Sequence, residues 1–215
     1  MMYRVTAGLV LGIFVSALLA SSFASADDKK GDDDQGWVQL FNGQDLKGWK
    51  THPKDKAKWE VKDGVLVGSG PAGHLFSERG DYENFIYRVE AKINDHGNSG
   101  QYFRTQFGPS FPKGYEAQIN STHRDPVRTG SLYNFGKEGT VTEMLVKPDE
   151  WFVQEVTADG NHIIIKVNGK TTVDLVDKKS TYTKGHFALQ QHDPGTVVMF
   201  RKIEVKELPA TKKEE

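Results

Sequence analysis

The segment FIYRVEAKI, residues 85–93, constrains the fold most strongly, because its apolar and polar side chains alternate with a period of two. In a β-strand one face would carry Phe85, Tyr87, Val89, Ala91 and Ile93, and the other face would carry Arg88, Glu90 and Lys92. After the N-terminal segment, no window of 11 or more residues shows a helical period. The chain is therefore expected to fold as β-structure.

Turn signals separate further short segments of the same kind. Asp63-Gly64, Asp159-Gly160 and Asn168-Gly169 each stand between two such segments, as in β-hairpins with two-residue turns. Many short strands with turns between them predict an all-β sandwich or barrel, here as one domain over residues 37–208. The strands expected are 37–41, 59–61, 65–67, 85–93, 101–105, 115–120, 151–158, 162–167, 170–175, 185–192 and 197–208.

The N-terminus has the three parts of a secretory signal peptide. Arg4 is followed by the apolar residues 5–20 and by Ala24-Ser25-Ala26, which resembles a cleavage site. The apolar run is short for a membrane span and no second run follows, so no transmembrane anchor is expected. We expect cleavage near Ala26, export to the periplasm or the medium, a charged linker over 27–36 and a disordered tail over 209–215.

Charge and composition limit the classes of partner and cofactor that are expected. The 28 basic and 29 acidic residues nearly cancel, which argues against nucleic acid or anionic lipid. The chain has no cysteine, so stability must come from packing. No glycine-rich phosphate loop or metal-binding spacing such as H-x-H occurs, so no cofactor is predicted. A divalent metal is not excluded, because a sandwich can assemble ligands from distant strands. The sequence carries no signal for an oligomeric state.

The segment GYEAQIN, residues 114–120, puts Glu116, Gln118 and Asn120 on one face of a strand. The same alternation aligns Tyr102 with Arg104 in residues 98–105, and His186, Gln190 and His192 in residues 185–192. These side chains suit directed hydrogen bonding better than the Lys and Glu of an ordinary wet face. Two interpretations stay open: a solvated outer face, or the floor of a carbohydrate-binding cleft.

Nine segments in order give the chain a specific resemblance over essentially all of residues 37–208. It resembles the 3-keto-disaccharide hydrolase domain family, formerly called the domain of unknown function 1080. The resemblance implies a concanavalin-like jelly-roll β-sandwich of two antiparallel sheets. The segments are WVQLFNGQDLKGWK, WEVKDGVLVGSG, YENFIYRVEAKI, GNSGQYFR, GYEAQIN, TGSLYNF, VNGK with Asp174, HFALQQH and FRKIEVKEL.

The resemblance also implies a substrate, a glycoside whose sugar is oxidised to a ketone at C3. A base would remove the C2 proton, the group at C1 would leave, and water would add back. Glu116 is the candidate for proton transfer, and Arg104 for stabilising the enolate or holding Glu116 ionised. His192 is a candidate proton shuttle. An Arg–Glu cross-strand pair and a surface histidine are the structural alternatives for Arg104 and His192.

Further residues are expected to contact the sugar. Gln118, Gln190 and Tyr133 are candidate contacts to sugar hydroxyl groups. His74 is a candidate that follows a glycine-rich loop, which could curl over the sheet edge, and Arg128 is a candidate in the loop 121–130, which could form a rim.

Two other functions remain possible on the sequence. The same sandwich and cleft would serve a non-catalytic, lectin-like carbohydrate-binding module, and a laminin-like sandwich would serve as a protein interaction domain. The latter predicts an exposed apolar patch in place of a polar cleft.

Overall fold

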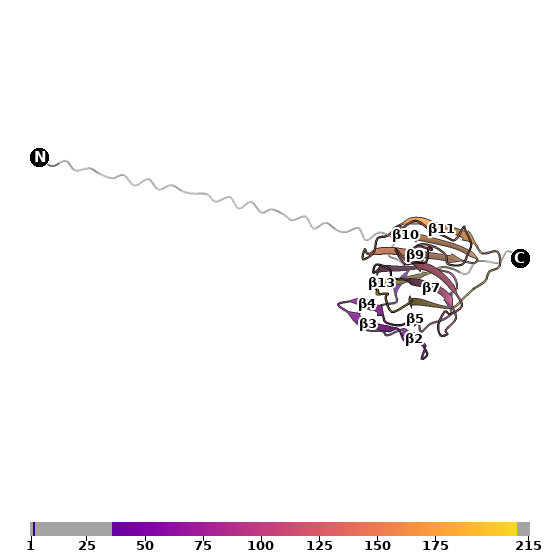
Figure 1. The fold of residues 1–215 in the computed structure, drawn as a ribbon, viewed down its shortest axis with the longest axis horizontal. Helices are drawn as coiled ribbons and strands as arrows, with labels where there is room; N and C mark the ends of the chain where they lie inside the picture. Colours follow the sequence, from indigo (N-terminus) through magenta and orange to yellow (C-terminus); the bar gives the residue numbers. More distant parts are fainter. Residues whose placement is uncertain (1, 3–35, 210–215) are drawn as a thin grey trace. The chain divides into compact units, whose positions relative to one another are not determined.

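Thirteen strands form two sheets in the part of the chain that the computed structural model describes, residue 2 and residues 36–209 (Figure 1). All strand pairs are antiparallel, which confirms the predicted β-sandwich. The predicted signal peptide, nearly all of the linker and the last residues lie outside the described part. No helix occurs in residues 36–209, and so none that could cross a membrane.

The larger sheet has the order β11-β10-β9-β6-β13-β4-β3, with β1 also paired to β13, and the smaller sheet has the order β2-β5-β12-β7-β8. The strands are β1 Trp37–Gln39, β2 Trp49–Thr51, β3 Lys58–Lys62, β4 Val65–Ser69, β5 Gly73–Ser77, β6 Phe85–Ile93, β7 Ser99–Thr105, β8 Tyr115–Ile119, β9 Phe152–Asp159, β10 His162–Val167, β11 Lys170–Val176, β12 His186–Gln191 and β13 Val198–Glu207. The three predicted hairpins are confirmed as β3–β4, β9–β10 and β10–β11.

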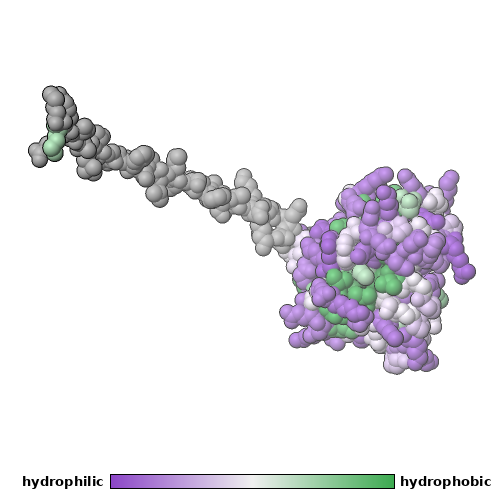
Figure 2. Space-filling view, turned by 60° about the vertical axis from the view of Figure 1, so that its left-hand side comes forward, coloured by the Kyte–Doolittle hydropathy of each residue, from purple (hydrophilic) through white to green (hydrophobic). Residues whose placement is uncertain are grey.

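The core lies between the sheets and is rich in aromatic rings. Phe187 of β12 stacks between Tyr82 and Tyr87, with ring centroids 4.1 and 4.0 Å away. The alternation read from residues 85–93 is confirmed, since every second side chain of β6 is buried. On the surface, Figure 2 shows one face on which a compact hydrophobic area is surrounded by hydrophilic side chains.

Two strands of the smaller sheet, β2 and β5, were not expected from the sequence. All five residues of β5 are buried, so the segment lacks the polar–apolar alternation that marks a half-exposed strand. The sequence placed His74 directly after a glycine-rich loop, and the structure shows that this residue belongs to β5. His74 is the second residue of β5, opposite Gln190 of β12.

The expectation that Arg104 faces the same way as Glu116 is also wrong, because β7 contains a bulge. Between His186–Thr105 and Ala188–Tyr102, strand β7 has one residue more than β12, and Arg104 has a φ of +50°. The extra residue breaks the period-two alternation and turns the side chain away from Glu116.

The guanidinium of Arg104 instead binds backbone carbonyls at one end of the sandwich. It donates to the carbonyl of Glu83 at 2.6 and 2.8 Å and to that of Gly160 at 2.7 Å. The residue is only 2% exposed. Arg104 therefore connects β7 to the chain before β6 and to the β9–β10 turn, and it is a structural residue.

Replacing Arg104 by Met should lower the free energy of unfolding by about 3 kcal/mol, because buried carbonyls would lose their donor. Urea unfolding measures the difference. Arg201→Met is the matched control: this exposed Arg pairs with Glu90 on the outer face of the larger sheet, and its loss should leave the free energy of unfolding almost unchanged. Equal, small losses for both variants would contradict the structural role of Arg104.

Candidate functional site

The outer face of the smaller sheet brings several of the predicted polar residues together. Glu116 of β8 pairs with Tyr102 of β7, and Tyr102 pairs with Ala188 of β12. One step along the strands, Gln190 lies opposite His74. Because Gln118 is two residues from Glu116 on β8, it shares this face.

A groove of about 1030 Å³ opens onto this face, and we call it the main groove. Loop residues form much of its wall, including the exposed Phe111 from the β7–β8 loop. Of the predicted site residues, Glu116, Tyr133 and His192 line it, together with Tyr102. Gln118, Gln190 and His74 are buried and do not line it, but each contacts Glu116 or Tyr102.

Hydrogen bonds hold the Glu116 carboxyl group from both sides. The Tyr102 hydroxyl donates to its Oε2 at 2.8 Å, and Gln190 Nε2 donates to the Tyr102 oxygen at 3.0 Å. With the amide of Gln118 oriented so that it donates, its nitrogen reaches Glu116 Oε1 at 3.2 Å and the carbonyl of Ser99 at 2.7 Å. This frame positions the carboxyl group but leaves it at the groove.

Gly100 makes the room for this carboxyl group. A Cβ atom at position 100 would lie 2.3 Å from Glu116 Oε1 and 2.8 Å from its Cγ. Such contacts are too short for any side chain to be tolerated without moving Glu116. The position of the acid therefore depends on a glycine in the neighbouring strand.

Burial raises the pKa of Glu116 to about 8, against a lowering by the Tyr102 hydrogen bond and a further rise from the charge of Asp125. A carboxyl group with this pKa is largely protonated at neutral pH and can exchange a proton in the physiological range. Burial also raises the pKa of Tyr102 well above its usual range, so its hydroxyl stays a donor.

His74 contributes packing to the site. Its ring lies edge-on to Tyr102 with centroids 4.9 Å apart, and it is 1% exposed. Burial lowers the pKa of His74 to about 4, despite the nearby charge of Asp55. The ring is thus neutral near pH 7 and packs against Tyr102 from β5, across the intervening strand β12.

Arg128 and Tyr133 both interact with the loop that follows β8. Arg128 Nη1 donates to the carbonyl oxygens of His123 and Asp125, and the Tyr133 hydroxyl donates to Asp125 Oδ2 at 2.9 Å. Arg128 thereby stabilises the loop. The sugar contacts expected for both residues stay predictions.

His192 lies at the end of β12, beside two groups that the sequence did not connect with it. Its Nδ1 is 3.0 Å from Asp193 Oδ2, and His123 Nε2 is 3.8 Å from the same oxygen. Ligand-type atoms of the three residues lie within 4.8 Å of one another, the spacing that a metal site would need. However, His123 Nδ1 accepts the N–H of Asp125 at 3.2 Å, which leaves the proton on the nitrogen facing Asp193 and so opposes metal binding.

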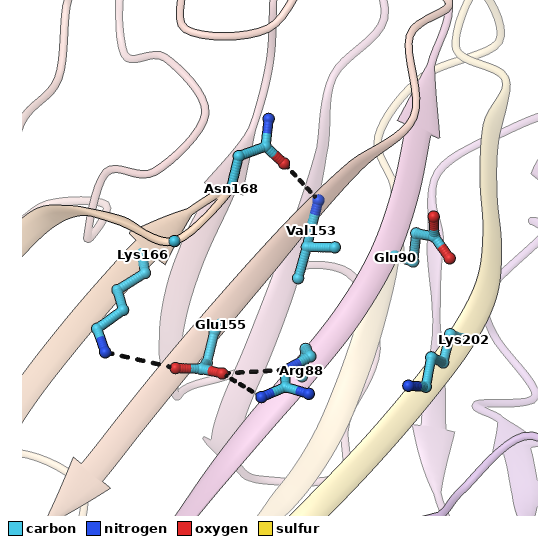
Figure 3. Close-up of a pocket in the computed structure, with 8 residues that line it drawn as sticks. Arg88, Glu90, Val153, Glu155, Lys166, Asn168 and Lys202 are labelled. Carbon is cyan, nitrogen blue, oxygen red and sulfur yellow. Dashed lines mark hydrogen bonds and ion pairs between the residues drawn. The ribbon is translucent and has the colours of Figure 1, made fainter. Parts of the chain in front are cut away.

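A second groove, of about 460 Å³, lies on the outer face of the larger sheet (Figure 3). Its charges are paired with one another: Glu155 accepts from Arg88 at 2.8 Å and pairs with Lys166 at 3.7 Å, and Arg88 also pairs with Glu204 at 3.0 Å. This is the ion-paired wet face expected from residues 85–93.

Comparison with known proteins places the chain in a family. The sequence profile of the 3-keto-alpha-glucoside-1,2-lyase-like domain matches residues 36–206. The chain belongs to this family. The match confirms the resemblance drawn from the nine segments. The name of the family refers to a lyase that acts on a carbohydrate. Among curated proteins, no sequence matches the chain.

Solved structures confirm the concanavalin-like fold. A Parabacteroides distasonis protein, provisionally assigned as a glycosyl hydrolase, is 24% identical over 82% of this chain and 96% of its own, with a TM-score of 0.64. A carbohydrate-binding module from Bacillus subtilis is 17% identical (74% and 96% coverage, TM-score 0.57). The carbohydrate recognition domain of Emp47p is 14% identical (82% and 99% coverage, TM-score 0.57). At these identities the likeness establishes the fold alone.

The raised pKa of Glu116 predicts how stability depends on pH. In the unfolded chain this group ionises near its ordinary value of 4.5, whereas in the folded protein it keeps its proton up to about 8. Folded wild type should therefore lose stability relative to Glu116→Gln as the pH rises from about 5 to about 8. Melting temperatures of the two proteins across this range measure the effect, and a constant difference would contradict the raised pKa.

Proposed function

We propose that this chain is an exported enzyme that cleaves 3-keto-glycosides, with Glu116 as a proton-transfer group. One observation carries the proposal: a carboxyl group with a pKa raised to about 8 is held by Tyr102 and Gln118 at the main groove. Membership of the 3-keto-alpha-glucoside-1,2-lyase-like family supports the substrate class. The signal-peptide pattern at the N-terminus supports export.

The reaction has a simple physical basis. A ketone at C3 makes the C2–H bond acidic, and a base removes this proton to give an enolate on C2, C3 and the ketone oxygen. The enolate electrons then form a C1–C2 double bond, and the bond from C1 to the aglycone oxygen breaks. That oxygen takes up a proton, and addition of water to the enone completes a net hydrolysis. Each step needs a proton-transfer group positioned at the sugar.

The groove offers such groups, but Arg104 is not one of them. The enolate would have to be stabilised by donors that line the main groove, such as the side chain of Lys113, because the Tyr133 hydroxyl already donates its proton to Asp125. The exposed ring of Phe111 gives an apolar surface against which a sugar or an aglycone can stack.

A non-catalytic carbohydrate-binding module is the second candidate. It is favoured by the solved Bacillus subtilis module of the same fold and by the mixture of hydrogen-bonding and aromatic side chains at the groove. Binding alone needs hydrogen bonds and not proton transfer, so the two functions differ in what Glu116→Gln does.

Activity on a 3-keto-disaccharide beside its unoxidised parent tests the proposal. Wild type should cleave only the keto sugar, and Glu116→Gln should lose at least about 100-fold in kcat/KM. Glu138→Gln is the matched control, because Glu138 is an exposed carboxylate of the same groove and should be dispensable. Binding of either sugar without cleavage by wild type would establish the binding module instead. Unimpaired cleavage by Glu116→Gln would remove Glu116 from the mechanism.

Gly100→Ala should impair cleavage about as much as Glu116→Gln, because its methyl group would displace the carboxyl group of Glu116. Gly108→Ala is the control, since a Cβ there meets no atom within 4 Å. The same assay, with melting temperatures to check folding, gives the comparison. Full activity of a folded Gly100→Ala protein would contradict the dependence of the acid on this glycine.

A further inference from the structure

The side chain of Asp193 lies between two imidazole rings at the rim of the main groove. Its Oδ1 accepts the backbone N–H of Gly195 at 3.0 Å, which fixes the plane of the carboxyl group. Its Oδ2 lies 3.0 Å from His192 Nδ1 and 3.8 Å from His123 Nε2. Burial would raise the pKa of Asp193, but the hydrogen bonds from His192 and Gly195 outweigh it and hold the pKa below its usual range. The group is therefore a carboxylate, which accepts hydrogen bonds only.

These contacts determine the tautomer of each ring. Since Asp193 can only accept, His192 must carry a proton on Nδ1, and its Nε2 is then an unprotonated acceptor in the neutral ring. His123 has the opposite tautomer, because its Nδ1 accepts the N–H of Asp125 and its Nε2 points to Asp193. Metal binding by His123 Nε2 would require this tautomer to invert.

His192 and Glu116 line the same groove, and the ring of Phe111 lies 5.8 Å from that of His192. The charged or titratable groups around His192 are Asp193 on its own segment, His123 on the loop after β8 and His74 on β5. Glu116 and Lys113 are further titratable groups that line the same groove. The groove thus contains two proton-transfer groups of different kinds: a carboxyl group that is protonated at neutral pH and an imidazole with one nitrogen free.

We propose that His192 Nε2 is the base of the reaction, that Glu116 is the acid, and that Asp193 is the positioning residue that fixes the tautomer of His192. This inference rests on the proposed function. His192 Nε2 takes the C2 proton, and the C–H electron pair passes into the enolate. When the C1–O bond breaks, the departing oxygen takes the proton of Glu116. In hydration, water gives a proton to the Glu116 carboxylate as it adds to C1, and the imidazolium returns a proton to C2, so both groups are restored.

Nitrogen-15 NMR of the histidine rings in the full chain tests the positioning without any substrate. In spectra recorded across a pH series, the neutral ring of wild-type His192 should carry its proton on Nδ1 and none on Nε2. In Asp193→Asn the preference should be lost and the proton should shift toward Nε2. A proton on Nε2 in neutral wild type, or an unchanged tautomer in Asp193→Asn, would overturn the proposal.

Turnover of the 3-keto-disaccharide tests the chemical role. Asp193→Asn and His192→Gln should each lower kcat by about 100-fold or more. Asp174→Asn is the matched control, because Asp174 makes a similar 2.6 Å contact to His162 on β10, outside the main groove. Full activity of His192→Gln would overturn its role as the base. If a chelator abolishes activity and changes the ring-nitrogen signals of His192, then His192 is a metal ligand. This result would also overturn its role as the base.

The experiments distinguish failure of the proposed enzymatic function from failure of the tautomer that Asp193 is proposed to fix. If wild type cleaves no 3-keto sugar but His192 shows the expected tautomer, the enzymatic function and the role of His192 as its base fall together, while Asp193 remains shown to fix the ring. If wild type cleaves the keto sugar and the tautomer is wrong, the enzymatic function stands and the present inference falls.

Discussion

Exclusion of water from much of the outer face of the smaller sheet determines the chemical character of the carboxyl group at the main groove. In an ordinary sandwich the outer face of each sheet is wet, as it is on β6 of the larger sheet, where Arg88 and Glu90 alternate with core residues. Here all seven residues of β7 are buried, and loops cover part of the outer face. A carboxyl group placed there loses hydration and keeps its proton, unless partners stabilise the charge.

The neighbouring polar groups follow from the same constraint. Each buried polar atom needs a partner, so Gln190, Tyr102 and Glu116 form one chain of hydrogen bonds across three strands. Gln101 and Gln154 form a similar buried pair, at 3.2 Å, on the core side of the sheets. The Gln190–Tyr102–Glu116 chain lies on the groove side of the smaller sheet. The Gln101–Gln154 bond connects that sheet to the larger one.

Much of the fold could be predicted from sequence where one face of a strand is wet and the other is dry. Residues 85–93 and the Asn-Gly and Asp-Gly hairpins gave strands and turns close to the observed ones. Strand β5 could not be predicted this way, because a strand buried on both faces has no alternation. Arg104 was misplaced because a bulge changes the parity of a strand, and no residue type signals it. Long-range pairing, and not local propensity, determines both features.

The candidate site was predictable in part for a related reason. Residues of one strand face can be read from spacing, which brought Glu116 and Gln118 together, and His192 with Gln190. The partners that give these groups their chemical character could not be read. Tyr102 was placed on the correct face but given no role, and Asp193 was not considered, because a hydrogen bond depends on side-chain direction as well as on backbone register.

The glycine at position 100 has a consequence for how function is traced to residues. The carboxyl group of Glu116 occupies space that exists because residue 100 has no side chain, and its proposed chemistry depends on that space. A survey of substitutions that assigns importance to polar and charged residues would pass over this position. In a protein built from strands, the vacancy in one strand can matter as much as the functional group in the next.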